Sequence, residues 1–140
     1  MYDLRPTVAA LLSLLLLGGC GGSSKMAPVA GTIAVNKKPQ ANLLIQFHPV
    51  GGSTGGGSGT STEGGKFEIL GADGKPGLLP GDYIVTVADA NLEVADEDLG
   101  KGTRIAPNRV DKKYQSTDAK INPLTIKVVM GKGSYELALD

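Results

Sequence analysis

One short stretch, Leu79 to Ala88 with the sequence LPGDYIVTVA, limits the fold more than any other part of the chain. Pro80 and Gly81 form a turn signal, because proline presets φ and glycine tolerates a positive φ. In the strand that follows, alternation gives two faces, Tyr83, Val85 and Val87 on one and Ile84, Thr86 and Ala88 on the other. Because both faces are mostly apolar, we expect a central strand with protein on one side and on part of the other.

Other apolar alternations predict six further strands, at residues 29–35, 43–47, 60–62, 66–70, 124–130 and 134–139. Turn residues join the first two of these strands and the last two, so the sequence predicts two hairpins. In the strand at 124–130 the alternation puts Leu124, Ile126, Val128 and Met130 on one face. Seven short strands without a helical period indicate an all-β fold over residues 29–140, either a sandwich or a barrel.

The N-terminus has the pattern of an export signal. Val8 to Leu17 would give only ~15 Å of helix, too short for a ~30 Å hydrocarbon core but typical of a signal-peptide helix. Leu17-Gly18-Gly19-Cys20 follows and resembles the lipobox of bacterial lipoproteins. This resemblance implies cleavage between Gly19 and Cys20, lipidation of Cys20, and anchoring in the bacterial cell envelope, in the outer membrane facing the periplasm or the surface. We therefore expect a lipoprotein signal peptide over residues 1–19 and a lipidated cysteine with a flexible tether over 20–28.

The globular part also resembles a known family. The matching elements are Val29-x-Gly31-x-Ile33, Lys38-Pro39, Phe47-x-Pro49, Glu63-Gly64-Gly65-Lys66-Phe67 and Leu79-Pro80-Gly81-x-Tyr83-x-Val85. In order and spacing they resemble carboxypeptidase regulatory-like, transthyretin-like domains, especially those of small lipoproteins from planctomycete-type bacteria. The resemblance implies an all-β, seven-stranded antiparallel β-sandwich of the prealbumin or immunoglobulin-like kind over residues 29–140, usually without enzymatic activity. It gives structural turn and core roles to Gly31, Pro39, Phe47, Gly65, Phe67, Pro80, Gly81, Tyr83 and Val85.

Composition argues against several classes of chemistry. The net charge is +0, so the chain has no basic excess for nucleic acid. One cysteine and one histidine are too few for the usual zinc sites, or for the two-tyrosine, two-histidine iron site of the intradiol dioxygenases that share the transthyretin-like fold. The single histidine leaves little for triad chemistry, and no serine lies in a nucleophile elbow. An EF-hand begun at Asp89 would have Val94 and Gly100 where glycine and glutamate are required. We expect no catalytic residue, no metal, no cofactor and no small-molecule substrate.

Two loops are long enough to carry a function. Residues 50–61 are glycine-rich but lack the Lys-Ser/Thr pair of a phosphate-binding loop, so we expect a flexible loop. Residues 91–113 are acidic and then basic, and Arg104, Arg109 and the two lysines that follow are expected to form surface ion pairs worth ~0–1 kcal/mol each.

Two binding functions remain open. The first is a non-catalytic, lipid-anchored envelope lipoprotein that serves as a structural or protein-interaction module. The alternative is a carbohydrate-binding envelope module, which would need an exposed aromatic residue for stacking. There is no Trp, and Tyr114, expected at the core edge with its hydroxyl in water, is the one tyrosine of the mature domain free to stack. His48 is expected to face solvent.

Overall fold

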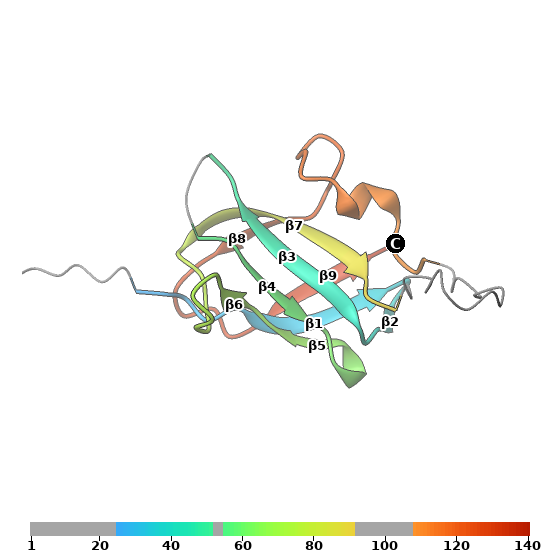
Figure 1. Ribbon diagram of the computed structural model, residues 1–140, viewed down its shortest axis with the longest axis horizontal. Helices are drawn as coiled ribbons and strands as arrows, with labels where there is room; N and C mark the ends of the chain where they lie inside the picture. Colours follow the sequence, from blue (N-terminus) through green and yellow to red (C-terminus); the bar gives the residue numbers. More distant parts are fainter. Residues whose placement is uncertain (1–24, 52–54, 92–107) are drawn as a thin grey trace, which may run out of the picture.

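The computed structural model describes residues 25–51, 55–91 and 108–140, and it is mostly β structure in two sheets (Figure 1). The predicted signal-peptide helix, the Gly19–Cys20 cleavage site and lipidated Cys20 lie outside the described residues. The elements are β1 Ala30–Val35, β2 Lys38–Pro39, β3 Leu43–Pro49, β4 Gly57–Thr60, β5 Lys66–Glu68, β6 Leu70–Gly71, β7 Gly81–Asp89, β8 Thr125–Val128 and β9 Tyr135–Leu139, with 3-10 turns η1 Glu63–Gly65 and η2 Lys112–Gln115. In the part of the chain so described, no helix is long and apolar enough to cross a membrane.

The prediction of a central strand after the Pro80–Gly81 turn is confirmed. β7 lies inside a five-stranded sheet of order β6-β4-β3-β7-β8, and it pairs antiparallel with β3 and β8. Tyr83, Val85 and Val87 are buried on its inner face, and Ile84 and Thr86 are also buried on its outer face. The apolar character of both faces therefore reflects cover on both sides, as the sequence indicated.

The second sheet has β1 at its centre. β2 and β5 pair with β1 antiparallel, while β9 pairs with it in parallel, from Gly31 opposite Tyr135 to Val35 opposite Leu139. The expectation of a purely antiparallel fold is therefore wrong for this pair. Gly31 makes the approach possible, because a Cβ at that position would collide with the Tyr135 carbonyl.

Both predicted hairpins are wrong. β1 and β3 lie in different sheets, and so do β8 and β9. After β1 the chain turns through Asn36 and Lys37, both at positive φ, pairs briefly as β2, and crosses to the other sheet at Asn42, also at positive φ. An alternating pattern specifies which face of a strand is buried, but it does not specify which strand lies beside it.

The glycine-rich segment is only in part the loop that the sequence predicted. Its last residues, Gly57–Thr60, form β4, which pairs with β3 and β6. A Cβ on Gly57 would collide with the carbonyl of Leu70, and one on Gly59 with that of Glu68. Glycine here lets β4 lie against the segment that crosses from β5 in one sheet to β6 in the other.

One hydrophobic cluster fills the space between the sheets, and the elements on both sides contribute to it. Its largest fully buried side chains are Tyr135, Phe47, Ile33, Leu43, Ile45, Ile69, Leu78, Leu137, Val29, Val85, Val87 and Val128. The inward assignment of Met130 is wrong, since β8 ends at Val128 and Met130 is exposed. Packing also begins earlier than Val29, because Ala27 is buried and pairs with Leu78, inside the predicted tether.

Candidate functional site

The sequence-predicted turn and core residues occupy structural positions in both sheets. Phe47 and Tyr83 meet edge to face with ring centroids 6.0 Å apart, and the Tyr83 hydroxyl donates to the Leu79 carbonyl at 2.7 Å. Burial raises the pKa of Tyr83. Val85 is buried in the same core cluster as these two rings. Pro80 lies in the bend before β7, and Gly81 begins that strand.

The remaining predicted positions gather around β1. Gly31 pairs with Phe67 of β5, which is buried, and Pro39 pairs with Ala34. Gly65 has a positive φ of 73°, and a Cβ there would collide with the Ile33 carbonyl. These residues shape turns and strand contacts, and none of them presents a reactive group to solvent.

A partly buried ion pair joins Asp89, at the end of β7, to Arg109. The Arg109 guanidinium donates to both carboxylate oxygens of Asp89, at 2.6 Å and 2.8 Å, and its backbone N–H donates at 3.1 Å. The Asp89 side chain is 2% exposed. Arg109 also donates to the Gln40 side chain and to the Ala41 carbonyl, each at 3.0 Å. The pair therefore ties together β7, residue 109 and the crossing between β2 and β3.

This geometry corrects the expected strength of the Arg109 pair. The hydrogen bonds from the Arg109 side chain lower the pKa of Asp89 to about 2, with smaller contributions from the backbone N–H groups of Arg109 and Asn91. The same contacts raise the pKa of Arg109. A bidentate pair with a carboxylate removed from water resists screening more than the exposed pairs that the sequence predicted. Arg104 lies outside the described residues.

The expectation for Tyr114 is wrong. Its ring is 2% exposed, and its hydroxyl donates to the Asp140 carboxylate instead of facing water. Lys113 lies 3.1 Å from the same carboxylate, with its ammonium 4.9 Å from the centre of the Tyr114 ring. The hydrogen bonds from Tyr114 and then Lys113 lower the pKa of Asp140 to about 2, and the bond to Asp140 raises the pKa of Lys113. Because Tyr83 and Tyr135 are buried too, the described residues offer no exposed aromatic ring for sugar stacking.

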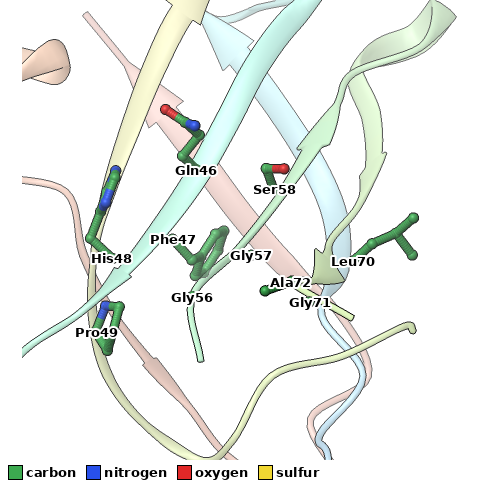
Figure 2. A pocket seen from close by; sticks show the side chains of 10 residues that line it. All are labelled: Gln46, Phe47, His48, Pro49, Gly56, Gly57, Ser58, Leu70, Gly71 and Ala72. Atoms are coloured by element: carbon green, nitrogen blue, oxygen red, sulfur yellow. The ribbon is translucent and has the colours of Figure 1, made fainter. Parts of the chain in front are cut away.

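A hollow of about 300 Å³ lies on the outer surface of the five-stranded sheet (Figure 2). Gln46 and His48 of β3 border it on one side, and Leu70 and Ala72 border it on the other, with Gly56, Gly57 and Ser58 between them. His48 is half-buried, and its Nε2 lies 2.8 Å from the Thr86 hydroxyl on the neighbouring strand. His48 thus faces away from the core, as expected, but it is held by β7 instead of being free in solvent.

Two buried polar residues were missed by the sequence analysis. Asn122 is fully buried, and its amide donates to the Val85 carbonyl at 2.8 Å and the Ser116 carbonyl at 2.9 Å. Ser61 is buried as well, donates to the Gln40 carbonyl and accepts from the Leu43 N–H. Neither has a periodic signal in the sequence, because each satisfies backbone groups at a crossing between strands.

Within residues 25–51, 55–91 and 108–140, no three His, Cys, Asp or Glu side chains gather as metal ligands. No family model, no curated protein and no solved structure matches this chain.

Proposed function

We propose that the chain is a lipid-anchored, non-catalytic lipoprotein of the bacterial cell envelope, with a transthyretin-like β-sandwich that serves as a structural or protein-interaction module. The observation that carries the proposal is the run Val8–Leu17 followed at once by Gly18-Gly19-Cys20. The packing of Ala27 against Leu78 supports it, because folded structure then begins seven residues after Cys20. Seven positions leave room for a short tether between a lipidated Cys20 and the first packed residue.

The decisive test of the anchor is incorporation of radiolabelled palmitate in a bacterial host. We expect the wild-type chain to be labelled and to require detergent for extraction. Cys20→Ser should lose the label and appear in the soluble fraction, while Ser23→Ala, a matched change three residues away, should leave both unchanged. A Cys20→Ser chain that still requires detergent contradicts the proposal.

Carbohydrate binding remains the second candidate, and the hollow beside β3 is what favours it. Gln46, His48 and Ser58 offer hydrogen-bonding groups at its border, which suit sugar hydroxyls. The burial of Tyr114 counts against it, because sugar platforms usually stack on an exposed ring. A glycan array of the mature protein tests it: binding that Gln46→Ala abolishes and Lys38→Ala leaves intact would establish this function, and an empty array would remove it.

A further inference from the structure

We propose that one end of the β structure rests on the surface of the bilayer that holds the lipid anchor, so that the domain has a fixed orientation on the membrane. This inference rests on the proposed lipid anchor at Cys20. The end concerned is formed by Lys25, Val50, Asp82 and residues 127–132, and we call it the tether end. The opposite end is formed by Asn42, Asp89, Arg109, Tyr114 and Asp140.

The exit point of the chain defines the tether end. The segment from Lys25 to Ala27 leaves the fold beside Leu78, just before the Pro80–Gly81 turn, at the left in Figure 1. Lys25 follows Cys20 by five positions, which allows at most about 17 Å of extended chain. β7 alone has nine residues and so spans about 30 Å. The anchor is therefore too short to let the domain turn freely, and it keeps the tether end nearest to the lipid.

Exposed apolar side chains gather at this same end. Val50 is 45% exposed, Val129 40% and Met130 51%. Register brings them together, because the Val50 N–H donates to the Asp82 carbonyl at 2.9 Å while Asp82 and Gly81 pair with Lys127 and Val128. Val50 and Val129 thus lie on opposite sides of β7, about two strand spacings or ~10 Å apart. Side chains of this kind suit the boundary between headgroups and acyl chains.

The charges around these apolar residues suit a phospholipid surface. Lys127 is exposed and pairs in register with exposed Asp82, Lys132 is exposed two positions after Met130, and Lys25 is exposed where the chain leaves the fold. The Lys132 ammonium lies 4.5 Å from the centre of the Tyr135 ring, whose hydroxyl accepts from the Val129 N–H at 3.2 Å. These contacts hold the segment that carries Val129, Met130 and Lys132 in place, and Lys132 adds a positive charge beside Met130 that suits a phospholipid surface.

A single tryptophan tests this orientation, because the sequence contains none. Met130→Trp places the probe at the tether end, and Ile121→Trp is the matched control, an apolar residue of similar exposure, 56%, on the segment after η2. Each full-length chain is expressed, its acylation is verified by mass spectrometry, and it is reconstituted into vesicles that contain brominated phosphatidylcholine. Circular dichroism checks that each variant retains its β structure.

We expect brominated lipid to quench the fluorescence of the Met130→Trp variant at least threefold more than that of the Ile121→Trp control. Adding Val50→Ser and Val129→Ser to Met130→Trp should reduce that difference without abolishing it, because the short anchor still keeps the tether end near the lipid. Equal quenching in the two variants would overturn the inference. A second outcome would also overturn the inference. If the Met130→Trp side chain is shielded from water in native membranes but is not quenched by lipid in the reconstituted vesicles, the patch contacts a protein and not the bilayer.

The anchor and the orientation can fail separately. A chain that is not acylated refutes the anchor, and the purified chain is then coupled through Cys20 to a maleimide phospholipid, which reproduces the same tether length. Stronger quenching at position 130 would then still support the membrane-facing surface. Equal quenching would reject that surface whether or not the cell adds a lipid.

Discussion

The two ends of the β structure are stabilised in different ways. At the opposite end, polar groups are paired, with Arg109 holding the buried Asp89 carboxylate and the hydroxyl of the buried Tyr114 bound to exposed Asp140. At the tether end, Val50, Val129 and Met130 are left exposed. The difference indicates that the opposite end contributes to folding through its side-chain contacts, whereas the tether end keeps apolar surface for contact with something outside the chain. Variants placed at each end, and between them, test this difference in how the two ends contribute to stability.

The largest effect is expected between the ends, where β7 runs from one to the other. Val85 is fully buried there, and Val85→Asp would place a charge among apolar side chains with no partner. We expect a loss of at least about 4 kcal/mol in the free energy of unfolding, enough to prevent stable folding. Circular dichroism and urea denaturation measure it, with Val85→Ile as the apolar control. A folded, soluble Val85→Asp protein would mean that this face of β7 is not in the core.

The next largest effect is expected at the opposite end. Arg109→Ala leaves the Asp89 carboxylate buried without its cation, which should cost about 3 kcal/mol of unfolding free energy. Arg109→Lys keeps the charge but loses the bidentate contact, so it should lower the free energy of unfolding by less than Arg109→Ala. Urea denaturation at neutral pH measures both. If Arg109→Ala costs less than about 1 kcal/mol, the pair behaves as an exposed one and the contrast between the ends disappears.

Acid should lower the free energy of unfolding somewhat less than Arg109→Ala does. The folded protein lowers the pKa of Asp89 from 3.8 to about 2, so the native state favours the ionised carboxylate. The resulting stability, about 2 kcal/mol, is present above pH ~5 and is lost as pH falls through the folded pKa near 2. Urea titrations between pH 6 and pH 2 measure it. Asp89→Asn should flatten this part of the profile, and an unchanged slope in that variant would assign the acid sensitivity to other groups.

The smallest effect on stability is expected at the tether end. Met130→Ser removes a side chain that is half exposed, so the free energy of unfolding should change by less than about 0.5 kcal/mol. The same urea experiment measures it, with Val128→Ser as a buried control two positions earlier that should cost several times more. A large loss for Met130→Ser would show that Met130 contributes to the core and is not a surface contact.

The sequence predicted burial well because burial follows from alternation within a strand. Tyr83, Val85 and Val87 face the core as expected, and so do Phe47 and Phe67. Strand neighbours were not predictable in the same way, because the β1–β9 pairing joins residues about a hundred positions apart and depends on the missing side chain of Gly31. The Asp89–Arg109 contact was foreseen only as one of several surface pairs, since its burial depends on how β3 and β7 meet.

For the candidate site, the sequence predicted a lipid anchor at Cys20, which stays a prediction, but it did not predict the exposed apolar residues at the tether end. Met130 was assigned inward because it continues the alternation of Leu124, Ile126 and Val128. β8 ends before it, because the chain crosses there to the other sheet, and the alternation then no longer reports on burial. The same limit applies to Tyr114, which packs in the core cluster and whose hydroxyl bonds to Asp140, a residue distant in sequence.

The parallel pairing of β1 with β9 has a mechanical consequence. A force applied at the start of β1 and at the finish of β9 acts along both strands in opposite directions. The load would act in shear on the five pairs in register, from Gly31–Tyr135 to Val35–Leu139. These pairs would bear the force together and would not separate one at a time. A domain held at its first strand and pulled at its last would resist extension through this ladder.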